Sequence, residues 1–558
     1  MGEGMEWKVY VWDTRARYLE HYVRYAERYT EDYGALETEL ANLMAAGEWS
    51  RDSGENLGVL ALAQWLYGGG VQFLHLRGHA REAVRLLRRA VEAARAAGDR
   101  RAEGKDLGSL GSAYLALGDA GRAIEYYEQA LAIAREIRDR HGEETHLGNL
   151  GVAYADLGEA RRAIEYHEQA LAIARKIGYR RGEGADLANL GNSYADLGDA
   201  RRAIEYYQQA LAIDRERGDR RGEGVDLGNL GAAYYRLGEV RRAIGAFEQA
   251  LIIARDIGDR RSEGNWLSNL GNAYFALGDA GRAIEYYEQA LAIAREIGDR
   301  RGEGTHLGEL GSAYDCLGEV RRAVEYYEQA LAIARESGDR RIAEKSLGNL
   351  GLAHRHLGEV WRAIECHEQA LEIAREIEDR YGEGNHLGNL GLAYADLGNV
   401  GRAIEYHERA LEIAREIGDR HGEGTDLGNV GNAYFALGET RRAIEYYEQA
   451  LEIAREIGDR RGEGNHLGNL GSAYSDLGEV RRAIEYYEQA LTVAREIGDR
   501  RGEGNQLANL GILAKEQGDL ARARQLWEQA LKIYEAIEDP NAERVRGWLD
   551  ELAGASAP

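Results

Sequence analysis

The chain has 558 residues, and its 96 acidic and 71 basic side chains give a formal net charge of −25 at pH 7. This balance argues against a protein that coats nucleic acid or an anionic membrane, because both tasks need clusters of basic side chains. The only prolines are Pro540 and Pro558, which favours uninterrupted helices and an all-α fold. The two cysteines, Cys316 and Cys366, are too few for a disulfide framework and fit a reducing, cytoplasmic location.

Residues 1–60 are predicted to form an N-terminal helical cap. They lack the apolar run of a signal peptide, and no later segment has the length and hydrophobicity of a membrane span. Tyrosines and leucines recur at steps of three and four residues, the spacing of one helix face: Tyr18, Tyr22, Tyr25, Tyr29, Tyr33, Leu36, Leu40 and Leu43. Residues 61–100 follow as a degenerate repeat, of which mainly the second half matches the units after it.

Residues 101–540 consist of eleven copies of a forty-residue unit, without a single insertion. A fixed period of this length is typical of a solenoid. In the copy at 461–500, apolar side chains at helical spacing predict two antiparallel helices of roughly 16–18 residues: Leu467, Leu470, Gly471, Tyr474 and Leu477, then Val480, Ala483, Ile484, Tyr487, Ala490, Leu491, Ala494 and Ile497. Gly498 is predicted to end the second helix and Asp499 to cap the next one.

The first helix of the unit is rich in glycine, with Gly462, Gly464, Gly468 and Gly471 in one copy. Each glycine costs roughly 0.8–1 kcal/mol relative to alanine, so an isolated helix of this composition should not hold. We therefore expect the neighbouring helix to pack closely at the glycines, with Ala483 and Ala490 as the matching small residues. Residues 541–558 are predicted to be a C-terminal capping helix and tail, with Asp539 as N-cap and Pro540 at the first helical position.

The spacing of Leu470, Gly471, Tyr474, Gly478, Ala483, Tyr487 and Ala490 resembles the signature of the tetratricopeptide repeat (TPR) family. Arg495 stands where the family has its closing proline, and six extra residues make the unit similar to the long repeats of Pins/LGN polarity adaptors and kinesin light chains. The resemblance implies a right-handed α-solenoid, a TPR superhelix of about twelve helix-turn-helix repeats with helical caps. Residues 17–49 also resemble the segment between the NTPase core and the TPR array of bacterial STAND regulators.

Motifs of catalysis and cofactor binding are absent from the sequence. It contains no Walker-type phosphate loop, HExxH, CxxC pair or serine elbow, so we expect no enzyme, no catalytic residue, no cofactor and no metal. The histidines at one equivalent position, His146, His306, His386 and His466, lie two or more repeats apart. This separation is too large for a shared metal, and they are predicted to be surface residues.

The repeats differ most on the first-helix face that holds Asn465, Asn469, Ser472 and Asp476, and in the TPR family this face lines the concave groove. In the middle of the array this face becomes aromatic and cationic, which is typical of a peptide-binding hot spot. The predicted partner-binding residues are Asn192, Tyr235, Arg236, Trp266, Asn272, Phe275, Asp315, Lys345, Arg355, His356 and Asn432. Arginine there suits a carboxylate or phosphorylated segment. The resemblance to Pins/LGN arrays implies that the three asparagines hold partner backbone. The alternative is that the variation between repeats is sequence drift on a solvent-exposed face, with repacking at Gly245 and Ala246.

Three functions are consistent with these features. The first is a non-catalytic adaptor whose groove binds a peptide or helix of a partner protein. The second is the sensor or autoinhibitory array of a STAND-type regulator, to which residues 17–49 point. The third is self-association, because near-identical units can stack or swap between chains.

Overall fold

The computed structural model describes residues 17–29, 33–53, 56–66 and 79–555. Every regular element in these ranges is a helix, and they contain no strand, so the predicted all-α class is confirmed. The chain divides into two compact units, unit 1 (Met1–Asp279) and unit 2 (Ala280–Pro558). The predicted domain boundaries at residues 60, 100 and 540 stay predictions. Parts of the predicted N-terminal cap and of the degenerate repeat lie outside the described residues.

Unit 1 begins with a helix over 17–28 and continues with α2 (Tyr33–Thr38), α3 (Leu40–Ser53), α4 (Asn56–Leu66), α6 (Ala80–Ala97), α7 (Arg100–Ala116), α8 (Ala120–Glu136), α9 (Arg140–Asp156), α10 (Ala160–Ile177), α11 (Arg180–Asp196), α12 (Ala200–Arg217), α13 (Arg220–Arg236), α14 (Val240–Asp256) and α15 (Arg260–Ala276).

Unit 2 contains α16 (Ala280–Ile297), α17 (Arg300–Cys316), α18 (Val320–Ser337), α19 (Arg340–His356), α20 (Val360–Glu376), α21 (Arg380–Asp396), α22 (Val400–Ile417), α23 (Arg420–Ala436), α24 (Thr440–Ile457), α25 (Arg460–Asp476), α26 (Val480–Ile497), α27 (Arg500–Glu516), α28 (Leu520–Ala536) and α29 (Asn541–Ala555).

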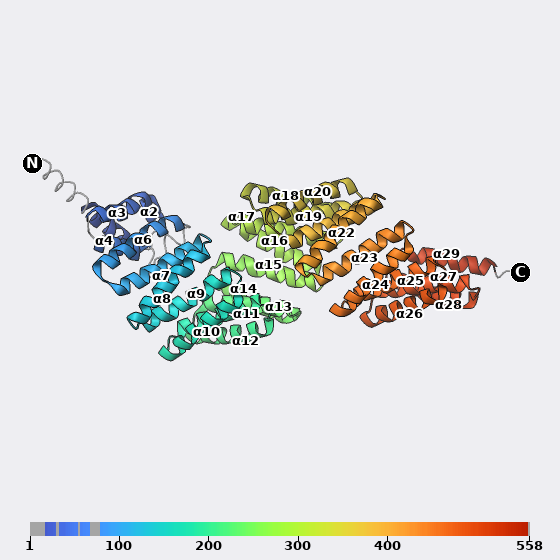
Figure 1. Cartoon of the computed structure of the whole chain (residues 1–558), viewed down its shortest axis with the longest axis horizontal. Coiled ribbons are helices and arrows are strands. Elements are labelled where there is room, and N and C mark those ends of the chain that lie inside the picture. The colour runs from blue at the N-terminus through green and yellow to red at the C-terminus, as the bar shows by residue number, and fades with distance from the viewer. Residues whose placement is uncertain (1–16, 30–32, 54–55, 67–78, 556–558) are drawn as a thin grey trace, which may run out of the picture. The chain divides into compact units, whose positions relative to one another are not determined.

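Within each unit the helices form a regular array (Figure 1). The first helix of a repeat, here called the A helix, packs against the second, the B helix, and the B helix packs against the next A helix. A helices of successive repeats also touch one another, for example α9 with α11 and α23 with α25. This arrangement confirms the predicted α-solenoid, whereas the right-handed sense of its superhelix stays a prediction.

The helix ends follow the predicted capping pattern. In the copy at 461–500, the carboxylate of Asp499 accepts a hydrogen bond from the backbone N–H of Gly502. Gly498 ends α26 with φ of 71°, a left-handed conformation that glycine adopts without a steric cost. Leu477 and Ile497, which were assigned to the apolar stripes, lie at the ends of their helices and are exposed. The last helix, α29, starts one residue after Pro540.

The glycines of the A helices make room for large side chains. A β-carbon added at Gly471 would lie 2.6 Å from Cδ1 of Tyr487, and one added at Gly111 would lie 2.7 Å from Cε1 of Tyr127. The predicted match of Ala483 and Ala490 to these glycines is therefore incomplete. The backbone oxygens of their equivalents Ala123 and Ala130 lie 3.1 Å and 3.9 Å from β-carbons built at Gly111 and Gly104, but the ring is the closer neighbour of Gly111. The ring of the B helix fills the space that the missing side chain leaves, and this ring-on-glycine contact recurs at the centre of most repeats.

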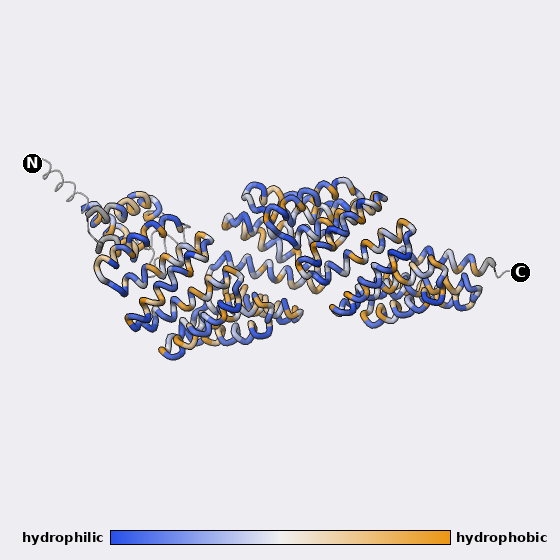
Figure 2. Tube along the Cα trace, viewed as in Figure 1, coloured by the Kyte–Doolittle hydropathy of each residue, from blue (hydrophilic) through white to orange (hydrophobic). Residues whose placement is uncertain are grey.

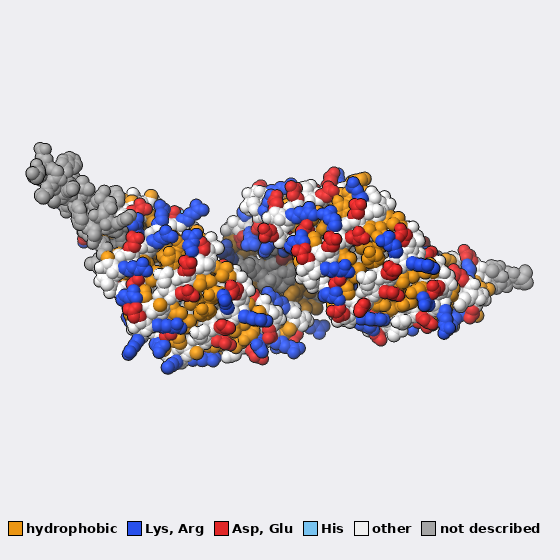
Figure 3. Space-filling model, in the orientation of Figure 1, with side chains coloured by type: hydrophobic (Ala, Val, Ile, Leu, Met, Phe, Trp, Pro, Cys, Tyr) orange, Lys and Arg blue, Asp and Glu red, His pale blue; other side chains and the backbone are white. Residues whose placement is uncertain are grey.

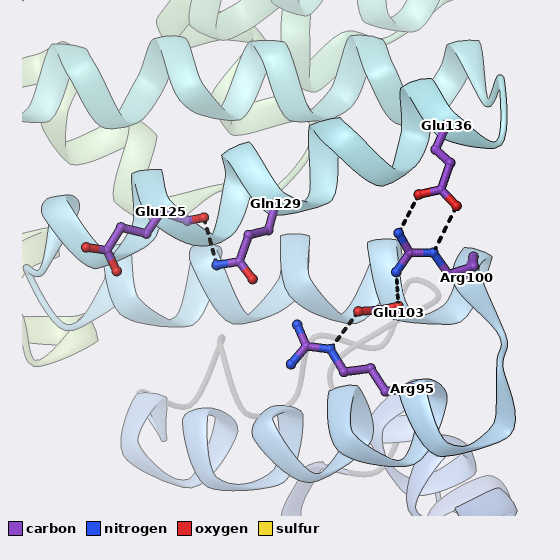
Figure 4. Close-up of polar contacts among 6 residues, drawn as sticks. All are labelled: Arg95, Arg100, Glu103, Glu125, Gln129 and Glu136. Atoms are coloured by element: carbon purple, nitrogen blue, oxygen red, sulfur yellow. Dashed lines mark hydrogen bonds and ion pairs between the residues drawn. The ribbon is translucent and has the colours of Figure 1, made fainter.

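A buried glutamate joins successive repeats (Figure 4). Oε1 of Glu103 accepts from Nε of Arg95 at 2.6 Å and Oε2 from Nη1 of Arg100 at 2.5 Å, and Arg100 also pairs with Glu136 of α8. The figure also shows Gln129 donating to the backbone oxygen of Glu125 within α8. Burial alone would raise the pKa of Glu103, but the two arginines outweigh it and hold the pKa below its ordinary value.

The same ion pairs recur along both units. An arginine of the preceding B helix and one at the start of the A helix meet each of these glutamates: Glu143, Glu183, Glu223, Glu263, Glu303, Glu383, Glu423, Glu463 and Glu503. Ala343 takes this position in the repeat 341–380, so α19 lacks the carboxylate there. The network fixes the A helices that carry this glutamate to the B helices before them.

The sixth residue of each repeat, here called the interface position, is buried or half-buried. Its occupants are Asp106, His146, Asp186, Asp226 and Trp266 in unit 1 and His306, Ser346, His386, Asp426, His466 and Gln506 in unit 2. The prediction that its four histidines lie on the surface is wrong, because they are only 5–9% exposed. Glycines of the preceding A helix admit the rings: β-carbons at Gly108 and Gly428 would lie 2.5 and 2.7 Å from Cε1 of His146 and His466.

The surface carries both signs of charge. Polar and apolar residues alternate along every helix (Figure 2), and acidic and basic side chains are interspersed on the visible face (Figure 3). Among the described helices, none has the length and apolar character needed to cross a bilayer. Cys316 and Cys366 are free thiols, and burial raises the pKa of Cys366 to about 11, so this thiol is a poor nucleophile. The cytoplasmic location stays a prediction.

Candidate functional site

A groove lies on the A-helix side of each unit. The unit 1 groove has a volume of about 770 Å³ and is formed by α7 and α9 with the end of α8. Its wall is largely apolar, with Leu115, Ile137 and Val152, and it contains the cation Lys105. The unit 2 groove has a volume of about 670 Å³ and is formed mainly by α23, α25, α27 and the terminal α29. Both volumes are in the range of peptide- and ligand-binding clefts.

The predicted partner-binding residues do not gather at one place. Six belong to unit 1, namely Asn192, Tyr235, Arg236, Trp266, Asn272 and Phe275, and five to unit 2, namely Asp315, Lys345, Arg355, His356 and Asn432. Asn432 lines the unit 2 groove, and the other ten line neither of the two grooves described above. Their role in partner binding stays a prediction. Tyr235 and Lys345 are exposed within their own units.

Several of the predicted cationic and aromatic residues already have partners inside the chain. Nη1 of Arg236 donates to the backbone oxygen of Ala195 at 3.0 Å, and Nε of Arg355 pairs with Oδ2 of Asp396 at 2.5 Å. Nδ1 of His356 lies 3.2 Å from Oδ1 of Asp315. These contacts each join one A helix to the next across a repeat interface. Arg236, Arg355 and His356 therefore connect successive repeats.

Trp266 also has a packing role. Its indole fills the space above Gly228 of the preceding A helix, where an added β-carbon would collide with the ring. The indole stacks on Phe247 with ring centroids 6.3 Å apart. Trp266 occupies the interface position, so its ring serves the contact between two repeats.

The twelfth residue of each repeat, here called the groove position, is matched to the buried ring beneath it. Where this residue is serine or asparagine, the ring is a tyrosine whose hydroxyl bonds to it at 2.7–3.2 Å: Ser112–Tyr127, Asn192–Tyr207, Ser312–Tyr327, Asn432–Tyr447 and Ser472–Tyr487. Where it is aliphatic, the ring is another type: Val152–His167, Ala232–Phe247, Leu352–His367, Leu392–His407 and Ile512–Trp527. A buried hydroxyl needs a partner, which explains the match.

The tyrosine hydroxyls orient the groove asparagines of unit 2. Oδ1 of Asn432 accepts from the hydroxyl of Tyr447 at 2.8 Å and from Nδ2 of Asn469 at 3.2 Å. Oδ1 of Asn505 accepts from the hydroxyl of Tyr534 at 2.8 Å. With the oxygens occupied, the Nδ2 groups of Asn432 and Asn505 are left to donate to a ligand. Further amides line the same groove, namely Asn429, Asn465, Asn509 and Asn541.

Two cations and an aromatic ring complete the unit 2 groove. Arg461 is exposed and pairs with no carboxylate of the described residues. The guanidinium of Arg544 lies 5.0 Å from the ring centroid of Trp548, and both come from α29. The groove thus offers hydrogen-bond donors and two guanidinium groups, and it also contains the carboxylate of Asp459, which accepts from the backbone N–H of Gly462 at the start of α25. The asparagines that recur in the A helices indicate this groove in the sequence. The residues that α29 contributes, Arg544 and Trp548, lie outside the repeats and have no such signal.

The tetratricopeptide repeat family model matches the chain at residues 71–136, 105–176, 142–216, 183–256, 225–296, 262–336, 302–376, 341–415, 382–456 and 458–536. The chain belongs to the tetratricopeptide repeat family. Arrays of this kind present extended surfaces to other proteins. A search of curated proteins finds no match.

Solved structures similar to this TPR chain are arrays of helical repeats. The quorum sensor NprR from B. thuringiensis in its apo form is 14% identical over 65% of this chain and 99% of its own, with a TM-score of 0.46. BtubC (BKLC) from P. vanneervenii is 25% identical over 39% of this chain and 92% of its own, with a TM-score of 0.37. A putative kinesin light chain from Podosopora anserina, described as having nearly identical TPR-like repeats, is 26% identical over 34% and 94%, with a TM-score of 0.31.

Proposed function

We propose that this TPR chain is a non-catalytic adaptor that binds an extended segment of a partner protein in the groove of unit 2. The observation that supports it is the orientation of the groove amides by buried tyrosines. The Nδ2 groups of Asn432 and Asn505 are held in place before any partner arrives, so binding costs little side-chain entropy.

The groups of the groove suit the main chain of a peptide. An extended segment carries a carbonyl oxygen on every residue, and the oriented Nδ2 groups are donors for such oxygens. Asn469, whose own Nδ2 is used by Asn432, has its Oδ1 as an acceptor for a backbone N–H. Donors and acceptors thus alternate along α23, α25 and α27, as the backbone groups of an extended chain do.

The two arginines of the groove favour an acidic partner. Arg461 and Arg544 supply positive charge, and Trp548 supplies a flat apolar surface beside Arg544. Arginine and tryptophan are the residue types that contribute most to binding energy at protein interfaces. A segment with an acidic residue and an apolar residue near one end fits these groups.

The experiment uses a library of short random peptides displayed on phage and selected on the full chain. Binding of a selected peptide is measured by titration calorimetry with the wild type and with Asn432→Ser. Serine keeps the bond to the tyrosine, as Ser112, Ser312 and Ser472 do, but lacks the amide donor. Loss of one hydrogen bond is expected to weaken binding by roughly 3- to 10-fold.

Asn192→Ser in unit 1 is the matched control, because Asn192 bonds to Tyr207 in the same way. It should leave the affinity unchanged. Equal affinities of wild type and Asn432→Ser, or equal losses in both variants, would contradict the proposal. The regulator array and self-association stay predictions, because no contact in the described residues favours either.

A further inference from the structure

Two aspartates of unit 1 are buried between repeats without a counter-charge. Asp186 of α11 and Asp226 of α13 are 3% and 2% exposed, and both occupy the interface position. Oδ2 of each has no hydrogen-bond partner among the described residues. We call them the interface aspartates. A carboxylate in such a place loses its hydration and gains nothing in return, so the protonated form is favoured.

The surroundings of Asp186 add negative charge. Its Oδ1 lies 3.3 Å from the place of a β-carbon on Gly148 of α9, and the same helix supplies Glu144, a second buried carboxyl. His167 of α10 is buried and, because burial lowers its pKa to about 4, it is neutral. Neither α12 nor α13 presents a described charged group that acts on Asp186. No described cation therefore compensates an ionised Asp186.

Asp226 is in a similar environment. Asp214 of α12 and Asp219 at the N-cap of α13 act on it, and Arg217 pairs with Asp214 at 3.1 Å rather than with Asp226. From α12 the buried ring of Tyr207 also faces it. The described groups of α11, α14 and α15 add no charge that acts on it. Both neighbouring charges are therefore of the same sign as the ionised Asp226.

The equivalent aspartate of unit 2 has a histidine nitrogen nearby. Oδ1 of Asp426 in α23 lies 3.9 Å from Nδ1 of His407 in α22. Burial raises the pKa of Asp426, and His407 opposes that rise. Unit 2 therefore supplies an internal reference at the same position of the repeat.

We propose that the interface aspartates make repeats 141–260 of unit 1 a pH-sensitive section, in which the helices pack while both carboxyls are protonated and separate more readily as they ionise. Because α9, α11 and α13 are A helices, this section includes part of the groove-side face of unit 1. Partner access to that face then depends on pH, whereas the groove of unit 2 does not contain the interface aspartates.

The direction of the pH effect follows from proton binding. Burial raises the pKa of each interface aspartate to about 8, and Glu144, Asp214 and Asp219 add to that rise. Between the ordinary aspartate pKa of about 4 and this value, the packed state holds more protons than the open state. Stability of the section is therefore greatest at acidic pH and decreases up to about pH 8. Each aspartate makes the opening equilibrium about tenfold larger per pH unit.

The test is hydrogen exchange of the full chain between pH 5.5 and 8.5, with rates divided by the intrinsic rate at each pH. Peptides of α11 and α13 should show an opening equilibrium that rises about tenfold or more per pH unit. Peptides of α23 should show a smaller rise. An opening equilibrium independent of pH in unit 1, or an equal rise in both units, would overturn the proposal.

Two variants separate titration from packing. Asp186→Asn with Asp226→Asn keeps the shape of the protonated side chains and should remove the excess slope of unit 1. Glu144→Gln removes the neighbouring carboxyl, so the upper end of the pH window in α11 should move to lower pH. An unchanged slope in the first variant and an unmoved window in the second would each contradict the assignment.

Discussion

Units 1 and 2 are built from the same repeat, yet they differ at two positions of it. At the interface position, unit 1 buries aspartates that have no counter-charge, whereas Asp426 of unit 2 faces His407. In the grooves, unit 1 has an apolar wall around Val152, and unit 2 has a row of amides around Asn432. The helix pairs recur in both units, and so do the Arg–Glu–Arg pairs, except at Ala343 in unit 2. The repeat therefore fixes the scaffold, and two positions per repeat carry the differences.

The largest expected effect comes from glycines at equivalent positions of the two units. Gly228→Ala in unit 1 would collide with the indole of Trp266, whereas Gly308→Ala in unit 2 meets nothing within 4 Å. We expect the first to destabilise the chain by about 1–3 kcal/mol and the second to stabilise it by up to about 1 kcal/mol. Denaturant unfolding followed by circular dichroism measures both. Equal effects in the two units would contradict the packing described for Trp266.

Breaking the ion network should have the next largest effect. Glu103→Gln removes the charge shared by Arg95 and Arg100, and we expect a loss of about 1–2 kcal/mol, since both arginines are half-exposed to water. The lowered pKa of Glu103 means that its contribution is present above the ordinary glutamate pKa of about 4.3 and disappears as pH falls through the folded-state value.

Melting curves of Glu103→Gln and wild type between pH 3 and 7 test this effect. Glu136→Gln, at the exposed partner of Arg100, is the control and should change little. Unit 2 already lacks this carboxylate in one repeat, where Ala343 replaces the glutamate. A Glu103→Gln protein as stable as wild type at pH 7 would show that the network adds nothing.

A smaller effect is expected where a side chain replaces the glycine that ends a B helix. Arg138 in unit 1 and Glu378 in unit 2 have φ of 58° and 57°, whereas glycines occupy the equivalent places in most repeats. Arg138→Gly and Glu378→Gly should each stabilise the chain by roughly 0.5–1 kcal/mol, because a left-handed conformation is strained for any residue with a β-carbon. Thermal unfolding measures this gain. A destabilised Arg138→Gly protein beside a stabilised Glu378→Gly protein would reveal a role for the arginine side chain.

The scaffold was predictable from the sequence because its signals are local. Helix length, the turns, the cap of Asp499 and the terminal Gly498 all follow from spacing and from residue type. The contacts between helices were harder to predict. The ring that meets Gly471 belongs to Tyr487, sixteen residues away, and helical spacing alone does not distinguish it from the alanines nearby.

The site was predicted less well for a physical reason. Variation between repeats suggests a binding face, but Arg355 and Trp266 are each matched to a neighbour in the adjoining repeat. Burial of a histidine at the interface position, such as His146, depends on a glycine in the preceding repeat, here Gly108, which the local pattern around the histidine does not contain. A comparison of equivalent positions, forty residues apart, detects such a pair only when the variable residue and its contact residue in the adjoining repeat are compared together.

The most direct test of the central claim locates the bound peptide on the chain. A photoreactive phenylalanine analogue replaces Asn465 in the unit 2 groove in one protein and exposed Glu485 on the B helix α26 in another. We expect the selected peptide to cross-link at position 465 and not at position 485. Cross-linking at position 485 with none at position 465 would contradict it.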